Sequence, residues 1–481
     1  MQLSKLIENV EVIEVIGDVL TDIKNVVIDS NSVTNGSLFI CIKGEEFDGA
    51  SFIRTAEMYG AKAVVSETKI NTSLPQVIVK DARTAMSLIA KAFYLNTCDK
   101  MKIIGVVGTN GKTSTAHLIG KILNESGIKC GVIGTLGTYF GNVFYEPTLT
   151  TPDPIILHKT LFEMYSSGYD TVVMEVSAHS VYYKKICGIK FAVGVFTNFS
   201  QDHLDFFKDM ESYRRVKKSF FDKTLYDFAV INADDNLGAQ LLGELERTVS
   251  YGINNPADVF AIDLKQTNTK TEYLINLFDC VGKVKNRLIG KFNVYNTLAA
   301  ATACALIGAK PNEVLTQLNS LNAIDGRLQC IIDKEYKVYV DYAHTPDGLE
   351  NVLKELKSKA KNRLINVFGC GGNRDQGKRS KMGEISAKYA DFTVITSDNP
   401  RYEEPMDIIY QIEKGVLKIC NNYVIVQDRF DAIEYAINMA KAGDVIVVAG
   451  KGSENYQEIL GVKRLYNDKN AIEEIVRRKS D

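Results

Sequence analysis

A glycine-rich segment carries the most specific chemistry of this sequence. It follows an apolar run at 103–107, precedes a helix predicted to begin near Thr113, and consists of Gly108, Thr109, Asn110, Gly111, Lys112, Thr113 and Ser114. In that context backbone N–H groups and a helix N-terminus face phosphate groups. Lys112 would reach the β- and γ-phosphates, and the Thr113 hydroxyl would hold Mg²⁺. We therefore expect a phosphate-binding loop, although the strict GxxxxGK(S/T) pattern has glycine where Val106 stands. A glycine turn without a ligand is the alternative.

Two further segments near strand ends could complete a metal site. Glu175 lies close to the end of an apolar strand predicted at 171–176. A carboxylate there is costly to bury unless a cation satisfies it, and either a metal ion or a structural ion pair would do so. Asp202 and His203 follow the next predicted strand, 192–196. His203 is either a ligand or a structural hydrogen-bonding residue.

Three regions of alternating strands and helices must position these residues. Residues 1–98 are predicted to form a small α/β unit, with strands at 24–28 and 37–42 and a helix at 50–60. In residues 99–328, strands end in polar residues, which predicts a doubly wound sheet with its site at the carboxyl ends of the strands. Residues 329–481 alternate regularly and predict a Rossmann-like domain. Its expected strands are 338–340, 364–368, 392–396, 424–426 and 445–449.

The composition excludes several classes of function. The net charge of −2, without any Lys/Arg block, gives no reason to expect nucleic acid or a membrane surface as partner. Nine scattered cysteines and five histidines, without CxxC or i,i+4 pairs, argue against disulfides and zinc. Acidic residues break every apolar run of the N-terminus, and no apolar stretch is long enough for a membrane span. We expect a cytoplasmic monomer.

Six segments occur in an order that resembles one known family, the Mur ligases. They are Gly108–Thr113, Glu175–His179, Thr197–Asp205, Gly290–Asn296, Asp341–Pro346 and Asp398–Arg401. The resemblance covers essentially the whole chain and implies domains for a uridine nucleotide, for ATP and for an incoming amino acid. It implies that ATP phosphorylates the D-glutamate carboxylate of UDP-N-acetylmuramoyl-L-alanyl-D-glutamate, and that the amino acid then attacks the acyl phosphate in peptidoglycan synthesis.

The resemblance also assigns nucleotide and metal contacts. Besides the loop, the ATP contacts would be Asn293, Asn296, Arg327, Asp341 and His344, each of which could alone be a capping or turn residue. The Mg²⁺ ligands would be Thr113, Glu175, His203 and, as a carbamate, Lys217, and the catalytic residues Lys112, His203 and Lys217.

Lys217 gains this role from the resemblance alone. Without it, Lys217 is a solvated lysine on a basic helix, and Lys218 leaves the register open. Carbamylation requires a neutral amine, which neighbouring cations such as Arg214 or Mg²⁺ would favour.

Arg401 is the most informative residue for the choice of amino acid. Meso-diaminopimelate differs from lysine by one carboxylate, which an arginine fork can bind bidentately. An arginine left unpaired would reject lysine by ~10⁴-fold. The resemblance adds Arg374, Asp398, Asn399, Pro400, Gly450 and Glu454 to this site, although the family usually has His where Ser453 stands. An exposed turn residue is the alternative for Arg401.

The acceptor nucleotide would be held by residues that partly depart from the family pattern. The expected contacts are Ser30, Thr150, Thr151, Ser177 and Lys185. Asn31 and Lys185 stand where arginine is usual, and Tyr183 replaces a polar residue; a lysine neutralises an anion only as a point charge. The other possibilities are a lysine-adding relative, a folylpolyglutamate-synthase-like enzyme, a P-loop ATPase that acts as a conformational switch, and a non-catalytic binding protein.

Overall fold

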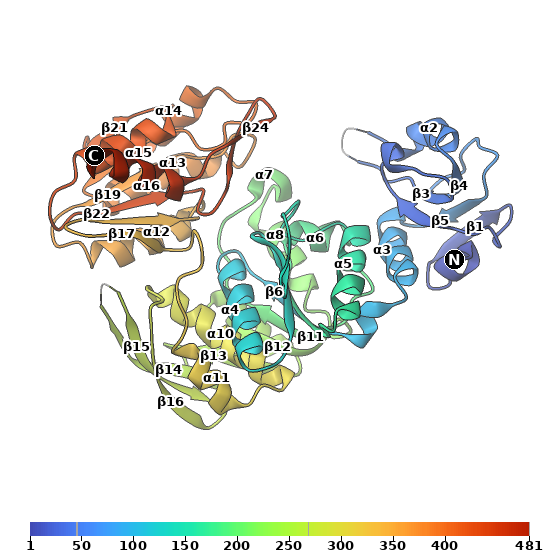
Figure 1. Cartoon of the computed structure of the whole chain (residues 1–481), viewed down its shortest axis with the longest axis horizontal. Coiled ribbons are helices and arrows are strands. Elements are labelled where there is room, and N and C mark those ends of the chain that lie inside the picture. The colour runs from blue at the N-terminus through green and yellow to red at the C-terminus, as the bar shows by residue number, and fades with distance from the viewer. Residues whose placement is uncertain (45–46, 268, 481) are drawn as a thin grey trace.

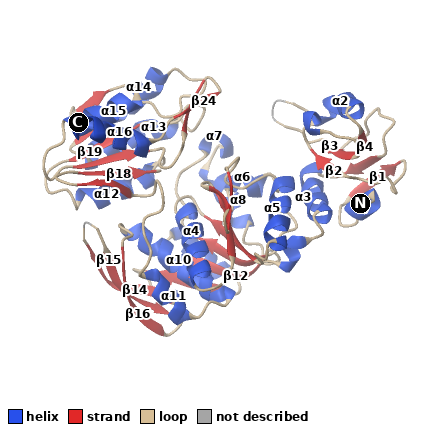
Figure 2. Cartoon of the chain, viewed as in Figure 1, coloured by secondary structure: helices blue, strands red, loops and turns tan. Residues whose placement is uncertain are grey.

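The computed structural model describes residues 1–44, 47–267 and 269–480. The chain forms three α/β regions, each built around its own sheet, and the central region lies between the other two (Figure 1). Helices and strands occur in all three regions (Figure 2). The predicted α/β class is confirmed.

The N-terminal region has a sheet of order β1-β5-β4-β3-β2. Its strands β2 to β5 are parallel and β1 is antiparallel. The predicted helix at 50–60 is a 3-10 turn, η2 (Gly49–Phe52), followed by α2 (Ile53–Met58). The other elements are α1 (Leu3–Leu6), β1 (Val12–Ile16), β2 (Asn25–Val27), η1 (Ser30–Ser32), β3 (Ser37–Ile40), β4 (Ala61–Ser66), β5 (Gln76–Val79), α3 (Ala82–Phe93) and η3 (Thr97–Lys100).

The central sheet has the order β16-β15-β14-β13-β12-β11-β6-β10-β7-β8-β9. Its middle strands are parallel, and antiparallel strands extend it at both edges. The strands are β6 (Lys102–Val107), β7 (Cys130–Gly134), β8 (Gly137–Phe140), β9 (Val143–Tyr145), β10 (Thr171–Glu175), β11 (Phe191–Phe196), β12 (Tyr226–Asn232), β13 (Thr248–Gly252), β14 (Val259–Gln266), β15 (Thr271–Leu277) and β16 (Cys280–Asn286).

Helices cover both faces of the central sheet because its strands are apolar on both sides. Ile104 and Val106 of β6 pack with α4 (Lys112–Glu125) and α10 (Lys291–Ile307), whereas Ile103 and Val107 pack with residues of α5 (Pro154–Ser166) on the opposite face. This two-residue period is that of a strand buried on both faces. The remaining helices are α6 (Ala178–Tyr182), α7 (Leu204–Phe207), α8 (Met210–Ser219), α9 (Asn236–Glu244) and α11 (Pro311–Leu318).

The third region has a sheet of order β17-β18-β22-β19-β20-β21, parallel except for β17. The strands are β17 (Gln329–Asp333), β18 (Lys337–Asp341), β19 (Leu364–Phe368), β20 (Phe392–Ile395), β21 (Tyr423–Ile425) and β22 (Val445–Ala449). All five expected strands are present, within a residue or two of their expected bounds. The helices are α12 (Pro346–Lys357), α13 (Gly377–Tyr389), α14 (Pro405–Val416), α15 (Arg429–Asn438) and α16 (Asp468–Ser480), and a hairpin, β23 (Tyr456–Ile459) with β24 (Val462–Leu465), lies beside the sheet.

The proposed domain boundaries lie between these sheets and stay predictions. The boundary at 98/99 falls inside η3, and that at 328/329 falls directly before β17. Within the part of the chain that the structure describes, no helix is both long and apolar enough to cross a bilayer.

Candidate nucleotide and amino-acid sites

A cavity of about 960 Å³ opens at the carboxyl ends of the central strands and reaches the third region. It brings together most of the predicted site residues: Thr109, Asn110, Gly111, Lys112, Thr113, Ser114, Thr150, Thr151, Glu175, Ser177, Lys185, His203, Lys217, Asn296, Arg327, Asp341, His344 and Arg374. The described lining does not include Ser30, Gly108, Asn293, Asp398, Asn399, Pro400, Arg401, Gly450 or Glu454.

The phosphate loop begins where β6 ends, and its glycines are required by close approaches. A Cβ on Gly108 would lie 1.8 Å from the Thr197 hydroxyl, and one on Gly111 would lie 2.5 Å from Asn296 Oδ1. Gly111 also has a φ of +84°, which favours glycine. Val106 is still part of the buried strand, so the loop needs no glycine there.

Two lysines, the partly buried Lys112 and the buried Lys217, point at the backbone carbonyls of this loop. Lys112 Nζ donates to Gly108 O at 2.9 Å and to Thr109 O at 2.8 Å. Lys217 Nζ donates to Gly108 O at 2.6 Å and lies 4.7 Å from the centre of the Tyr213 ring. Among the described residues, neither lysine forms an ion pair with a carboxylate. Burial lowers the pKa of both amines, and for Lys217 the neighbouring Lys112 lowers it further.

Lys217 is therefore not a solvated residue, and that alternative is wrong. Its side chain is 2% exposed, whereas the Lys218 side chain is 42% exposed and pairs with Glu244. The cation near Lys217 is Lys112 and not Arg214, which lies 3.7 Å from Glu211. The packing of α8 thus decides which of the two adjacent lysines points inward.

Glu175 connects the end of β10 to the first turn of α4. The residue is 1% exposed, and its carboxylate accepts hydrogen bonds from the Thr113 hydroxyl at 3.0 Å and from Thr135 N at 2.8 Å. Arg327 Nη2 donates to the same Thr113 hydroxyl at 3.0 Å. No carboxylate–cation pair involving Glu175 occurs within the described ranges, so the structural ion pair considered as its alternative is absent there. Thr113 and Glu175 together offer adjacent oxygen atoms to a cation.

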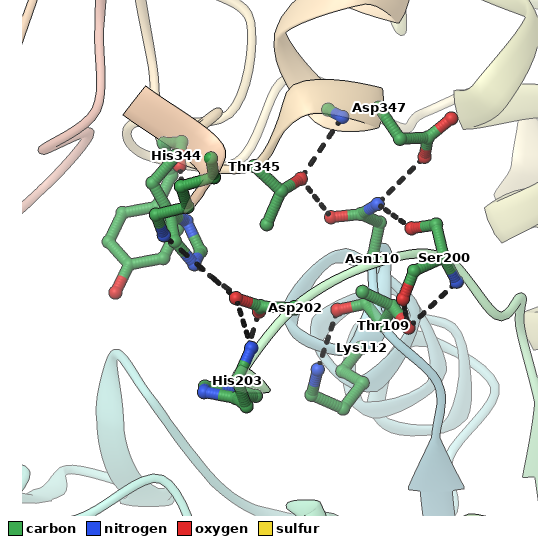
Figure 3. Close-up of polar contacts among 12 residues, drawn as sticks. Thr109, Asn110, Lys112, Ser200, Asp202, His203, His344, Thr345 and Asp347 are labelled. Carbon is green, nitrogen blue, oxygen red and sulfur yellow. Dashed lines mark hydrogen bonds and ion pairs between the residues drawn. The ribbon is translucent and has the colours of Figure 1, made fainter. Parts of the chain in front are cut away.

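Asp202 gathers basic groups from two regions of the chain (Figure 3). Its carboxylate lies 3.3 Å from His203 Nε2, 3.8 Å from His344 Nε2 and 3.9 Å from Lys378 Nζ. Burial alone would raise the pKa of Asp202, but His203, His344 and Lys378 hold it below its usual range. Burial lowers the pKa of His203 to about 3, which leaves its imidazole neutral at pH 7.

The phosphate loop also contacts the third region directly. Asn110 Nδ2 donates to Asp347 Oδ2 at 2.9 Å and to the Ser200 hydroxyl at 3.3 Å (Figure 3). Asp347 lies in the first turn of α12, which Thr345 caps by accepting from Gly348 N at 3.1 Å. Sequence reasoning missed Asp347 and Lys378, because nothing along the chain relates them to the loop.

The predicted acceptor residues lie at one side of the cavity, except for Ser30. The Thr151 hydroxyl donates to Glu175 O at 2.8 Å and accepts from Ser177 N at 3.0 Å. Lys185 Nζ lies 2.8 Å from Asp153, and the Thr150 hydroxyl lies 3.1 Å from that of Thr135. Ser30 is buried in η1 of the N-terminal region, away from the cavity.

Two predicted ATP contacts of the C-terminal half are held inside the protein. Asn293 Nδ2 donates to Ile289 O at 2.8 Å, so it stabilises the start of α10 and does not line the cavity. Asp341, at the end of β18, lines the cavity but accepts from Leu328 N at 2.6 Å and from Ala343 N at 2.7 Å. Burial raises its pKa.

The predicted amino-acid residues form a second cluster in the third region. Asn399 Nδ2 donates to Glu454 at 3.0 Å, and Lys451 Nζ donates to Glu454 at 2.8 Å. A Cβ on Gly450 would lie 2.8 Å from Asp398 Oδ2. Lys451 was not predicted, because nothing in the sequence around a lysine between two glycines indicates that its side chain is buried.

The Arg401 side chain is 19% exposed and has two partners, which does not favour the alternative of an exposed turn residue. Its Nη1 donates to Gly372 O at 2.7 Å and its Nε lies 3.3 Å from Glu458 Oε2. A Cβ on Gly371 would lie 3.0 Å from Arg401 Nη1 and 3.7 Å from Arg374 Cγ, which places the two arginines beside one loop.

The site combines a phosphate loop, a strand-end carboxylate and two lysines without carboxylate partners at one sheet edge. These features define an α/β protein that binds a nucleoside triphosphate. Family models match three segments: the Mur ligase family, catalytic domain at 22–94, the Mur ligase middle domain at 106–304, and the Mur ligase, glutamate ligase domain at 326–452. The chain belongs to the Mur ligase family.

Relatives and solved structures agree with this assignment. The chain is 42% identical, over 98% of both chains, to UDP-N-acetylmuramoyl-L-alanyl-D-glutamate--2,6-diaminopimelate ligase 1 of Clostridium acetobutylicum. It is 41% identical to the 2,6-diaminopimelate ligase of the same name from Clostridioides difficile, over 98% of this chain and 99% of that one. A solved structure of a UDP-N-acetylmuramoyl-L-alanyl-D-glutamate--2,6-diaminopimelate ligase is 30% identical, with a TM-score of 0.71 over 100% of this chain and 99% of that one.

Proposed function

We propose that this protein is an ATP-dependent ligase that joins meso-2,6-diaminopimelate to UDP-N-acetylmuramoyl-L-alanyl-D-glutamate in peptidoglycan synthesis. The observation that carries the proposal is the placement of Lys112 and Lys217, which bond to loop carbonyls and not to carboxylates. These two amines can therefore interact with anions without breaking an ion pair. The substrates are those in the names of the full-length relatives.

The reaction brings two anions together, so positioning and charge neutralisation must supply most of the catalysis. The D-glutamate carboxylate attacks the γ-phosphorus, the bond to the β-phosphate oxygen breaks, and ADP leaves. The neutral amine of the amino acid then attacks the acyl phosphate and loses one proton, an amide forms and phosphate leaves. Lys112 would neutralise the transferring phosphoryl group, and Arg327 approaches the same loop through Thr113.

Mg²⁺ fits the residues beside the loop. Mg²⁺ prefers oxygen ligands and keeps several waters and phosphate oxygens, so it needs only one or two protein carboxylates. Thr113 and Glu175 offer such oxygens 3.0 Å apart, and neutral His203 would add a nitrogen. Among the described residues no group of three or more His, Cys, Asp or Glu side chains forms a ready-made site. When bound, the ion would neutralise phosphate charge.

Lys217 as a carbamate would add a further oxygen ligand. Carbamylation joins a neutral amine to CO₂ and releases a proton, and burial favours the neutral amine of Lys217. Its bond to Gly108 O keeps the nitrogen beside the phosphate loop.

The second cluster would receive the amino acid. Arg401, supported by Arg374, would bind the distal carboxylate of diaminopimelate, and Glu454 with Asp398 and Asn399 would bind its ammonium end. Ser30, Thr150, Thr151, Ser177 and Lys185 would contact the acceptor nucleotide. We place this reaction in the cytoplasm and propose a monomer.

Phosphate release with ATP and Mg²⁺ tests the proposal when the acceptor nucleotide and the amino acids are added in turn. Release that requires both the acceptor and meso-diaminopimelate, with a new amide detected by mass spectrometry, is expected. Equal release with lysine would make the protein a lysine-adding relative. Release that neither reactant changes would make it a switch ATPase.

A further inference from the structure

The loop that carries Arg401 is held by the neighbouring hairpin. Gln457 Nε2 donates to Asp398 O at 2.7 Å and Glu458 N donates to Asn399 Oδ1 at 2.9 Å. Arg401 N donates to Glu458 O at 3.1 Å, and Leu460 N donates to Arg401 O at 2.7 Å. The hairpin therefore holds Asp398, Asn399 and Arg401 of this loop.

The backbone of Arg401 shows how tightly it is held. Its φ of +52° is unusual for a residue with a side chain. Such a conformation persists only when the surroundings over-determine it, and here Glu458 O and Leu460 N bond to the two sides of the same residue. The Cα–Cβ direction of Arg401 is thus set by β23.

The guanidinium is fixed at two of its nitrogen atoms. Nη1 donates to Gly372 O at 2.7 Å, and Nε faces Glu458 Oε2 at 3.3 Å. The guanidinium has five N–H donors in one plane, and within the described chain no acceptor is bonded to Nη2. Contacts at Nε and Nη1 define the plane and leave donors of the Nη fork for a ligand.

A second carboxylate, that of Asp398, interacts electrostatically with this guanidinium. Burial raises the pKa of Asp398, but Lys451, Arg429 and Arg401 together hold that pKa below its usual value, so Asp398 is ionised beside Arg401. A guanidinium released from Glu458 could turn toward Asp398. Glu454 is occupied by Lys451 at 2.8 Å and by Asn399 at 3.0 Å.

We propose that Glu458 is a positioning residue for amino-acid specificity: by holding Arg401 at Nε, it keeps the Nη fork directed at the distal carboxylate of the incoming diamino dicarboxylic acid. The inference rests on the proposed function. Glu458 itself does not touch the substrate. Its effect is confined to substrates that carry the second carboxylate, because lysine offers nothing for the fork to bind.

Steady-state kinetics of Glu458→Ala and Glu458→Gln test the inference with the full-length protein. In Glu458→Ala the KM for meso-diaminopimelate is expected to rise about fivefold, the upper value for loss of a partly exposed ion pair, while kcat and the KM values for ATP and the acceptor stay within about twofold. Glu458→Gln keeps an acceptor for Nε and should show a smaller rise. The low kcat/KM for L-lysine, measured at high enzyme concentration, should not change.

Glu384→Ala is the matched control, because it removes a carboxylate from another pair of the same region, that with Lys418 at 2.6 Å. It should leave all constants unchanged. An unchanged or lower KM for diaminopimelate in Glu458→Ala would overturn the inference, as would a parallel loss with lysine. If Glu458→Ala does not fold, the near-isosteric Glu458→Gln decides alone. A parent protein without diaminopimelate-dependent release refutes the proposed function, whereas an active parent with unaffected variants refutes only the role of Glu458.

Discussion

The central cavity and the amino-acid cluster hold their basic groups in different ways. Lys112 and Lys217 bond to backbone carbonyls of the phosphate loop, whereas Arg401 faces Glu458 and Lys451 faces Glu454. A buried amine bonded only to neutral groups resists protonation, and a nearby anion reverses that effect. A paired cation has its charge balanced already.

This difference matches the charges of the proposed substrates. ATP and the acceptor carboxylate are anions. Their binding is favourable in a cavity that contains amines without carboxylate partners. A diamino dicarboxylic acid carries both signs, and a cluster of ion pairs can exchange partners with it at little net change in charge. The central cavity is thus suited to binding anions, and the amino-acid cluster is suited to discriminating between similar zwitterions.

The sharpest test of the comparison is Lys112→Met. We expect phosphate release to fall on the order of 10⁴-fold, as when a cation is removed from a transferring phosphoryl group. Lys121→Met is the control on the same helix, because Lys121 is half-exposed and pairs with Glu125 at 3.7 Å. More than a tenth of the parent rate in Lys112→Met would contradict the role given to this amine.

The next largest difference between the two regions is expected in the free energy of unfolding. Arg429 and Asp468 of the third region are both fully buried and form a two-pronged pair at 2.8 Å. Arg429→Met leaves Asp468 unpaired and should cost about 3–5 kcal/mol of the free energy of unfolding. Lys217→Met removes an amine that has no carboxylate partner and should cost less than about 1 kcal/mol, although activity is lost. Urea denaturation followed by circular dichroism measures both, since the chain has no tryptophan; equal losses would remove the distinction.

Specificity should change with little effect on nucleotide binding when the third region alone is altered. Arg401→Ala is expected to raise the KM for meso-diaminopimelate by about 10²-fold, the loss of a charge-assisted fork of about 3 kcal/mol. The KM for ATP should stay the same, because Arg401 does not line the central cavity. A parallel rise in both constants would show that the regions are not independent.

The smallest effect concerns a buried base of the central region outside the cavity. His158 of α5 is 1% exposed, its Nε2 has no hydrogen-bond partner among the described residues, and burial lowers its pKa to about 4. Between pH 6.5 and 4 the unfolded chain binds a proton that the folded one does not, so stability falls as the pH falls. The loss is about 2 kcal/mol at pH 5. His158→Leu should remove this part of the pH dependence in urea midpoints; an unchanged profile would place the acid sensitivity elsewhere.

Local patterns predicted fewer than half of the strands and did not predict how the sheets are extended. Buried parallel strands such as β6 and β19 are continuous apolar runs, which can be recognised without a partner. The antiparallel strands β14 to β16 and the hairpin of β23 and β24 depend on pairing with other segments and on exposed faces, and they were not predicted. The phosphate loop was predicted because strand, glycines and helix are adjacent in the sequence.

The candidate site shows the same limit. Residue types and family resemblance indicated Lys217, but only the packing of α8 distinguishes it from Lys218. Lys378, Asp347 and Glu458 come from segments far from the residues they contact. Their roles depend on long-range contacts, about which side-chain type and spacing say nothing.

The hydroxyl of Thr113 has a consequence for the order in which the complex assembles. It donates to Glu175 and accepts from Arg327, the arginine that precedes the third sheet. A hydroxyl oxygen has two lone pairs, of which Arg327 uses one, so a divalent ion that binds the other lone pair would place a second positive charge beside the guanidinium. Binding of the metal ion would therefore weaken the contact between the central and third regions. Protease sensitivity around residue 327 would then report whether the metal ion is bound at Thr113.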